Sequence, residues 1–424
     1  MKPMNAMKVR RPWFWLFVGA NVVGAYVMLD TGELIGDAAG RPLHSVAALY
    51  LAVLLVLLSY WLILGPLFNA LMRVRVKPVQ LAVDEGMLGS RLGKLLLALQ
   101  ITYFLFNIAY GVNTAGSANS GESVPFALFW VFVPVDALMV IYYGYYRDNR
   151  LFYPNVIVWT VSNLARGWSG IFLFIIFFEW CRAGRRGAIR KGRVALLGLL
   201  VIVLYPVLIN LKWIMRASAQ TNLGFAEVAD GFAAVLETEA YTSLVGDGLM
   251  QIVGRLQTTS SVVEVIRLRD LLQDEFAMGR FTPFWLEGLH GIVYDRLMHG
   301  VKSMPIGVAF TEYALLDTRL ELGSWNTNIG YVGWFFIAPL YVPLYLAYTL
   351  LLGYLSVFLV KKVGMTAQAS DMVWLTWLVY LLPPWHAAFV GFLYALAVFL
   401  VLKLIVSRKA AGTVDYALPA GSAG

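Results

Sequence analysis

The stretch LFYPNVIVWTVSNLARGWSGIFLFIIFFEWC, residues 151–181, places Arg166 between two apolar runs. A helix rises about 1.5 Å per residue, so each run of about 15 residues is shorter than the ~30 Å hydrocarbon core of a bilayer. An arginine that faces lipid is costly. We therefore expect two short membrane arms with Arg166 at their junction, in a cavity filled by water or ligand. In the alternative interpretation, Arg166 lies at a helix end and contacts a lipid headgroup.

The composition of the whole chain agrees with a membrane protein. The 424 residues are 60% hydrophobic and 14% charged, whereas soluble domains are roughly 25% charged. Apolar runs recur from residue 13 to residue 406 and do not alternate with polar residues, which excludes an outer-membrane barrel. Cys181 is the single cysteine, so an intramolecular disulfide is excluded. The sequence predicts an all-α polytopic membrane protein.

Apolar runs of about 20 residues mark the expected membrane spans. Two stretches, 151–181 and 372–406, are broken in the middle, the second at Pro383 and Pro384. The unbroken runs are 13–29, 45–72, 94–111, 125–146, 194–211, 333–360 and 387–406. The prediction is about ten membrane segments, with segments 1–7 in residues 1–211, an external domain in 212–332, segments 8–10 in 333–406 and a tail in 407–424.

Basic loops fix the expected orientation, because cytoplasmic loops of membrane proteins collect Lys and Arg. Such loops precede or follow alternate spans, at residues 8–11, 73–77, 147–150, 181–193, 361–362 and 407–409. The prediction is a protein of the bacterial inner membrane with both termini in the cytoplasm and the turn at Arg166 on the periplasmic side. The net charge of +8 resides largely in these loops, so no nucleic-acid partner is expected.

Residues 212–332 differ from the rest of the chain. They hold 14 of the 25 acidic residues and 9 of the 33 basic residues. Apolar residues near 3.6 spacing predict a helix over 224–245, and SSVVEVIRLRDLLQDEF predicts a second helix with Ser260 or Ser261 as N-cap and Glu264 early in it. We expect a helical periplasmic loop domain that covers the membrane cavity.

Arginines are frequent on the expected external side. Their planar guanidinium groups match phosphate oxygens and stay charged, which favours capture of a lipid phosphate or pyrophosphate. The alternative is ion pairing within an acidic domain, for example between Glu264 and Arg267. Arg166 and Arg255 have few acidic neighbours in the sequence. The external arginines are Arg166, Arg216, Arg255, Arg267, Arg269, Arg280, Arg296 and Arg319.

His290 and Glu287, in WLEGLHG, are candidate general bases, since both residue types accept protons from hydroxyl groups. Glu264 and His386 are weaker alternatives, and a structural role for a single histidine stays open. No HExxH, Walker or GxGxxG motif occurs, so neither a metal nor a nucleotide cofactor is expected.

The stretch DTRLELGSWNTNIGYVGWFF, residues 317–336, ends the external domain and leads into a span. Its polar, turn-rich part contains Asn326, Asn328 and Gly330. Trp325 and Trp334 are residue types that suit a membrane interface and also stack on sugar rings. An ordinary interfacial loop is the alternative.

These features together resemble the Wzy-type oligosaccharide repeat-unit polymerases of bacteria, in the O-antigen and exopolysaccharide pathways. The similarity lies in the many spans, the late external loop, the segment 325–355 that leads into an aromatic helix, and the spacing from Arg319 to Gly330, which is similar to an Arg-x10-Gly element of some members. The Arg-bearing LARGWSGIFLF, residues 164–174, is also similar. Arg166 lacks a glycine at the matching spacing, so only one such element is present.

The resemblance implies a GT-C-like membrane glycosyltransferase that joins undecaprenyl-pyrophosphate-linked oligosaccharide units at the periplasmic face. It implies that Arg166, Arg255 and Arg319 hold the pyrophosphate and that His290 or Glu287 takes the proton of the acceptor hydroxyl. The residues expected to bind glycan are Trp285, Tyr294, Trp325, Asn326 and Asn328. Expected partners are the lipid-linked oligosaccharide, membrane lipid and a chain-length regulator protein.

Two other functions remain open at this stage. One is a related transferase, either an O-antigen ligase or an enzyme that uses polyprenyl-monophosphate sugars; the acidic set Asp30, Glu33 and Asp37 in the first external loop is the signal for the latter. The other is a transporter of lipid-linked glycans, although the two halves of the chain do not repeat.

Overall fold

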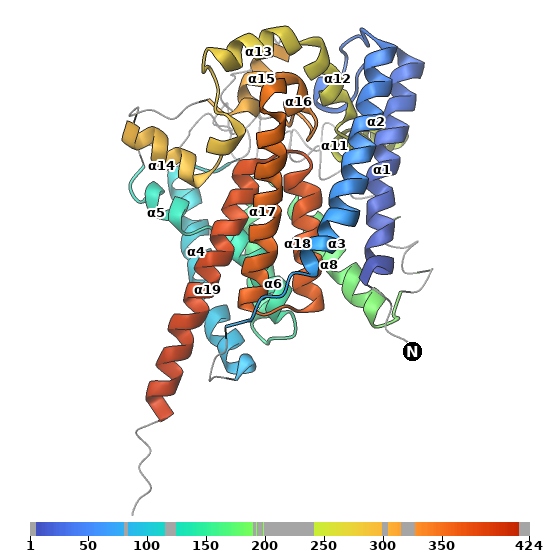
Figure 1. Ribbon diagram of the computed structural model, residues 1–424. Coiled ribbons are helices and arrows are strands. Elements are labelled where there is room, and N and C mark those ends of the chain that lie inside the picture. The colour runs from blue at the N-terminus through green and yellow to red at the C-terminus, as the bar shows by residue number, and fades with distance from the viewer. Residues whose placement is uncertain are drawn as a thin grey trace, which may run out of the picture.

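The computed structural model describes residues 6–79, 84–114, 124–189, 192, 198, 241–298, 304–314 and 327–414. In this part of the chain the structure is helical and has no strand, only an isolated bridge between Glu33 and Pro42. Long helices run along one another, and short helices gather at one end of them (Figure 1).

Six helical stretches among the described residues are long and apolar enough to cross a membrane. This confirms the prediction of a helical membrane protein. They are α1 (Ala6–Thr31), the run of α2 (Val46–Leu62), η2 (Ile63–Leu67) and α3 (Phe68–Met72), α4 (Glu85–Tyr110), α5 (Ala127–Phe132) with α6 (Val135–Tyr146), η5 (Pro339–Tyr341) with α17 (Val342–Val363), and α19 (His386–Val414). The predicted span 194–211 lies outside the described residues, apart from residue 198.

The ends of these helices follow from local sequence. Ser45 accepts a hydrogen bond from the Ala48 amide (3.2 Å) and so caps α2, and Asp84 accepts one from the Met87 amide (2.9 Å) and caps α4. Gly111, with φ of 61°, ends α4 in the left-handed conformation that favours glycine. The π-helical turn η2 contains Pro66, which has no amide proton to continue the α-helical pattern.

The predicted span 333–360 begins too early. Residues Gly333–Ile337 form a separate short helix, α16, and the membrane helix begins only at Pro339. Ala338 is non-helical (φ −135°, ψ 66°), as expected for a residue before proline. The predicted last span, 387–406, agrees with the apolar stretch His386–Ser407, and the helix α19 continues beyond it to Val414.

Three further helices are shorter than a bilayer. The two arms predicted around Arg166 are confirmed as α7 (Phe152–Ala165, 14 residues) and α8 (Ile171–Arg185, 15 residues), which corresponds to about 21–23 Å each. The third is α18 (Ala367–Thr376), which continues as η6 (Trp377–Leu381). The break predicted at Pro383–Pro384 is also found, between η6 and α19.

The basic helix ends meet at one end of the bundle, the lower end in Figure 1, where α1 begins. The Lys361 ammonium donates to the Met72 carbonyl (2.7 Å), and the Val79 amide donates to the Lys362 carbonyl (2.9 Å). A buried ion-pair network joins α1, α8 and α18 there, since Asp371 pairs with both Arg10 and Arg185. The grouping agrees with the loop pattern used for the orientation; the side of the membrane stays a prediction.

Short helices occupy the opposite end (Figure 1). The described part of the predicted 212–332 domain packs on the bundle through them: α12 lies against α2 and α16, η3 against α17, and α14 against α19. They are α11 (Tyr241–Leu256), α12 (Thr259–Arg267), α13 (Arg269–Ala277), η3 (Phe284–Leu286), α14 (Leu289–Met298) and α15 (Ile306–Ala314).

The predicted N-cap of the second external helix is wrong. Helix α12 begins at Thr259, before Ser260 and Ser261. The backbone amides of its first turn, which have no acceptor within the helix, donate to the side chains of other residues. Oδ1 of Asn21, a fully buried residue of α1, accepts from the amides of Thr258 (2.9 Å) and Thr259 (3.2 Å). Oε1 of Gln257 accepts from the Ser260 amide (2.9 Å). A membrane helix thus caps α12, which fixes this external helix to the bundle.

Candidate functional site

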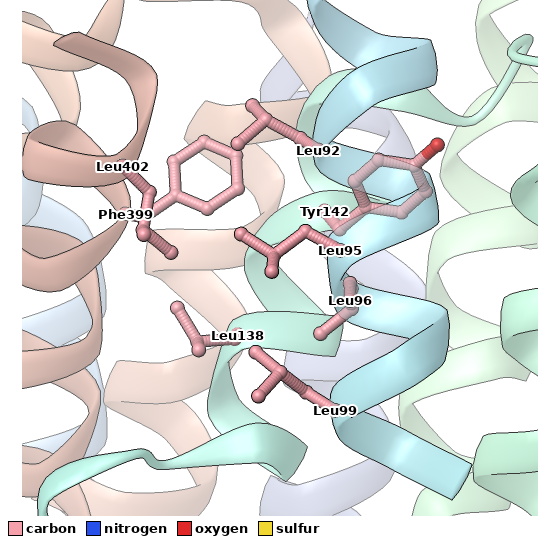
Figure 2. Close-up of a pocket in the computed structure, with 8 residues that line it drawn as sticks. All are labelled: Leu92, Leu95, Leu96, Leu99, Leu138, Tyr142, Phe399 and Leu402. Carbon is pink, nitrogen blue, oxygen red and sulfur yellow. The ribbon is translucent and has the colours of Figure 1, made fainter. Parts of the chain in front are cut away.

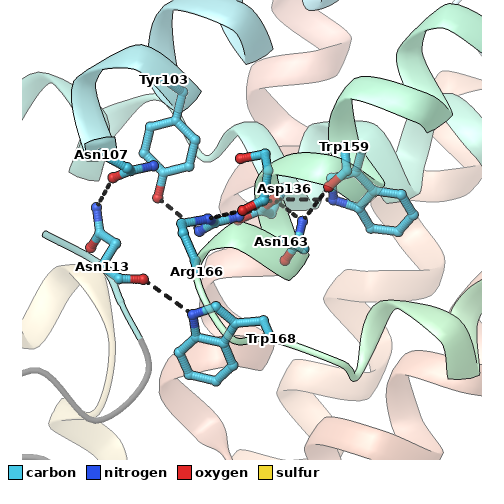
Figure 3. A network of polar contacts seen from close by, with 9 residues as sticks. Tyr103, Asn107, Asn113, Asp136, Trp159, Asn163, Arg166 and Trp168 are labelled. Carbon is cyan, nitrogen blue, oxygen red and sulfur yellow. Dashed lines mark hydrogen bonds and ion pairs between the residues drawn. The ribbon is translucent and has the colours of Figure 1, made fainter. Parts of the chain in front are cut away.

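Arg166 faces a carboxylate of a neighbouring helix (Figure 3). Its Nη2 lies 2.8 Å from Oδ2 and 3.0 Å from Oδ1 of Asp136. Nε donates to the Ser162 carbonyl (3.1 Å), Nη1 to the Tyr103 hydroxyl (3.4 Å), and the guanidinium carbon lies 5.1 Å from the centre of the Tyr103 ring. The buried cation is therefore satisfied on all three nitrogens by the protein itself.

Both charges of this pair lie at favourable helix ends. Asp136 is in the first turn of α6, and Arg166 is the C-cap of α7, where an anion and a cation respectively interact well with the helix dipole. Oδ1 of Asp136 also accepts from the Trp159 indole and the Asn163 amide, each at 3.0 Å. The Asp136 side chain remains 40% exposed. Binding of a phosphate by Arg166 stays a prediction, and it would require exchange with Asp136.

Arg255 lies beside the first external loop. Its Nη1 is 2.8 Å from Oδ1 of Asp37, and its side chain is 44% exposed. The backbones come close at this point: a Cβ atom on Gly36 would lie 2.8 Å from the Gly254 carbonyl oxygen. Only glycines fit there, so the sequence of the loop and that of α11 together position the pair.

The acidic set of the first loop does not form a metal site. Asp37 pairs with Arg255, while Asp30 and Glu33 are exposed. Within the part of the chain that the structure describes, no group of three or more His, Cys, Asp or Glu side chains could hold a metal ion.

The two predicted general bases differ in their exposure to solvent. His290 is exposed on α14, and its Nε2 is 2.7 Å from the Trp285 carbonyl oxygen. Glu287, three residues earlier, is buried at the end of η3. The positive φ of Gly288 (114°) turns the chain between them, and a Cβ atom there would lie 2.9 Å from Val390 of α19. The turn directs Glu287 into the bundle.

Glu287 meets His386, the first residue of α19. Oε2 of Glu287 lies 3.5 Å from Nδ1 of His386, and the histidine is fully buried. This distance exceeds that of a good N–H···O hydrogen bond. The rings of Tyr345 and Tyr348, both of α17, stand edge-on to the imidazole with centroids 5.6 and 5.8 Å away. The pair thus lies where η3 meets two membrane helices.

Several buried polar atoms around this pair lack a hydrogen bond within the described part of the chain. They are both ring nitrogens of His386, the hydroxyls of Tyr345 and Tyr348, and Nε1 of Trp334. Nine in ten buried polar groups of native proteins have a partner, and a missing one costs about 1–3 kcal/mol. Such a group of unpaired atoms is uncommon in native proteins, which makes this place a candidate for a functional role.

Burial shifts the acidity of Glu287. Removal from water raises the pKa of its carboxyl above the ordinary value of 4.5, and the neighbouring His386 only partly offsets this effect. A carboxylate of raised pKa is a stronger base near neutral pH. Buried ionisable groups with a charged partner are frequent at functional sites. We therefore take Glu287, His386, Tyr345, Tyr348 and Trp334 as the candidate site, called the Glu287–His386 cluster below.

The residues predicted to bind glycan are partly described. Trp285 packs against Phe284 and Tyr341, with centroids 4.7 and 5.6 Å away. Tyr294 is 42% exposed on α14. Oδ1 of Asn328 accepts from the Gly330 amide (3.3 Å). Arg319, Trp325 and Asn326 lie outside the described residues.

A separate apolar pocket lies between α4, α6 and α19 within the membrane-crossing region (Figure 2). Leucines of α4, among them Leu92 and Leu96, face Phe399 of α19 and Leu138 of α6 across it. Such a lining accepts hydrocarbon and offers little to a polar ligand.

Comparison of the chain with protein-family models, with curated proteins and with solved structures gives no match.

Sequence reasoning named His386 only as a weak alternative and did not name Asp136, Tyr345 or Tyr348. One signal for His386 was present: it follows a double proline inside an apolar stretch, and an ionisable residue at such a break usually faces a cavity or a partner.

Proposed function

We propose that this chain is a membrane glycosyltransferase that joins undecaprenyl-pyrophosphate-linked oligosaccharide units, with Glu287 as the general base. The observation that carries the proposal is the buried Glu287–His386 cluster, where a helical layer meets the membrane helices α17 and α19. A lipid-linked sugar reaches such a place from the bilayer, since its headgroup lies at the membrane surface.

The reaction requires removal of one proton. The acceptor hydroxyl gives its proton to the Glu287 carboxylate, and its oxygen forms a bond to the anomeric carbon of the donor. The bond from that carbon to the pyrophosphate oxygen breaks, and the lipid pyrophosphate leaves with the electron pair. His386, with Nδ1 3.5 Å from Oε2 of Glu287, stabilises the carboxylate before transfer.

The arginines serve the leaving group in this proposal, since fixed positive charge stabilises the developing pyrophosphate. Arg255 is 44% exposed, so an anion can approach it from solvent, but its partner Asp37 is only 17% exposed and must give up this contact. Arg166 is buried and fully paired, so its part in binding needs displacement of Asp136. Arg319 completes the proposed set.

The proposed setting is the bacterial inner membrane, with both termini in the cytoplasm and the Glu287–His386 cluster on the periplasmic side. The grouping of basic helix ends at the opposite end of the bundle supports this orientation.

The test is chain extension by purified full-length protein in liposomes that contain lipid-linked oligosaccharide. We expect Glu287→Gln to abolish longer products. Asp270→Asn, a comparable loss of one charge at an 87% exposed carboxylate of the same layer, should keep them. If Glu287→Gln extends the glycan chains as the wild type does, Glu287 is not the general base. If Glu287→Gln has normal activity and His290→Asn is inactive, His290 is the general base.

The same liposomes separate the other functions. Transfer of the glycan to lipid A core instead of to another unit identifies a ligase. Movement of the labelled lipid across the bilayer without new glycosidic bonds identifies a transporter.

A further inference from the structure

A small pocket with three arginines lies at the basic end of the bundle, far in the fold from the Glu287–His386 cluster. It is formed where α6 and α8 end and α18 begins. Arg147 follows α6, and Arg182 and Arg185 belong to the last turn of α8. Tyr143 and Gln368 also line the pocket.

Local structure explains why the arginines stay in place. The last turn of a helix favours cations, which suits Arg182 and Arg185. The Arg147 guanidinium lies over the rings of Phe152 and Tyr153, at 4.2 and 4.9 Å from their centres. The fold thus holds the three arginines in place.

The carboxylates near this pocket do not neutralise it. Nε of Arg147 lies 2.5 Å from Glu179, Arg182 pairs with Asp148, and Arg185 pairs with Asp371. Arg10 shares Asp371, and Arg186 reaches Asp148 at 3.6 Å. Five arginines therefore face three carboxylates, which leaves an excess of two positive charges among the described residues.

Two guanidinium nitrogens at the pocket are buried without an acceptor. They are Nε of Arg182 and Nη2 of Arg185, and neither has a hydrogen bond within the described part of the chain. Glu179 and Asp148 are partly open to solvent, so their ion pairs are weak and exchangeable. Unpaired N–H groups with surplus positive charge are the donors that a phosphate oxygen needs, and a phosphate reaches them by replacing the partly exposed carboxylates.

We propose that this pocket binds one phosphate group. Its place at the end of the membrane helices makes the phosphodiester of an anionic lipid headgroup one source, and free phosphate is the other. The site does not depend on the proposed transferase function, because none of its residues belongs to the Glu287–His386 cluster.

Native mass spectrometry of the full-length protein tests this. The protein is released from nanodiscs that contain equal amounts of phosphatidylglycerol and phosphatidylcholine, and retained lipids are counted. We expect selective retention of phosphatidylglycerol, reduced about tenfold in Arg182→Gln, which loses a charge-assisted contact. Arg150→Gln is the matched control, because Arg150 is an exposed arginine that follows the same helix α6 but neither lines the pocket nor belongs to the five arginines counted above.

A second variant distinguishes loss of binding from misfolding of the protein. Gln368→Glu breaks no ion pair and adds a negative charge to the lining, so it should also abolish retention. Equal retention of both lipids, or an equal loss in Arg150→Gln, overturns the proposal for lipid. The second arm adds inorganic phosphate to protein in neutral detergent: thermal stabilisation that disappears in Gln368→Glu identifies free phosphate as the source. No effect in either arm overturns the proposal altogether.

Discussion

Asp136 and Arg166 join the first turn of α6 to the C-terminal end of α7, with Nη2 of the arginine 2.8 Å from Oδ2 of the aspartate. The arginine is buried and the aspartate is 40% exposed. This asymmetry has a measurable consequence, because water can solvate only one of the two charges when its partner is removed.

Asp136→Asn should destabilise the protein more than Arg166→Ala does. The first change leaves a buried cation without its counter-charge, whereas the second leaves a carboxylate that still accepts from Trp159 and Asn163. We expect a cost of about 1–3 kcal/mol for Asp136→Asn. Thermal unfolding in detergent measures this loss of stability. The double variant Asp136→Asn/Arg166→Ala gives the coupling free energy between the two residues.

The same variants test the phosphate role of Arg166. If the arginine serves only to pair with Asp136, the double variant Asp136→Asn/Arg166→Met extends chains as the wild type does. If it binds pyrophosphate, extension is lost in every variant of Arg166, including those of normal stability.

Glu287 should make stability depend on pH. Its pKa is raised in the folded protein, so between the ordinary value of 4.5 and the folded value the native state keeps a proton that the unfolded chain has lost. Stability therefore falls as pH rises through this window. Glu287→Gln removes this dependence, while Asp270→Asn keeps it. Parallel pH profiles of melting temperature for wild type and Glu287→Gln would contradict the shift.

Gly330→Ala should destabilise the protein more than Gly32→Ala does. Both glycines have similar positive φ, 69° and 71°, so both variants bear the strain of a left-handed alanine, about 1–2 kcal/mol. Only at Gly330 does the added Cβ meet an atom, Cγ2 of Val262 at 2.6 Å, while Gly32 has open space. Equal melting temperatures of the two variants would show that α12 moves aside freely.

Asn21→Ala should loosen α12. Oδ1 of Asn21 accepts from two backbone amides and from the Thr259 hydroxyl (2.8 Å). Loss of such a cap costs about 0.5–2 kcal/mol, and the effect should appear as faster hydrogen exchange in residues 258–263. Val22→Ala, at the adjacent and exposed position of α1, is the control. Unchanged exchange in Asn21→Ala would show that α12 holds its first turn without this cap.

The parts of the fold that depend on neighbouring residues were predictable. Long apolar runs gave the six long helices, and the polar turn at Arg166 gave the division into α7 and α8. The pair of Glu264 and Arg267 was also expected, and its oxygens and nitrogens lie 2.6–2.8 Å apart. Residues three apart in a helix are neighbours whatever the rest of the chain does.

The parts that depend on packing between distant segments were not predictable. Asn21 caps a helix 237 residues away, Arg166 pairs with an aspartate 30 residues before it, and Glu287 meets a histidine on the last membrane helix. Hydropathy orders segments along the chain but contains no information about which helices touch. The residues predicted to be chemically important were therefore named without their partners.

Helices α7 and α8, of 14 and 15 residues, leave part of the bilayer thickness uncovered. A hydrocarbon core measures about 30 Å, so in the predicted membrane setting the lipid beside this hairpin would have to become thinner or let water in as far as its turn. A polar headgroup that approaches there descends less far than it would beside a full-length helix. If α7 and α8 are membrane segments, as the sequence predicts, the short hairpin would itself shape the membrane at this side of the protein.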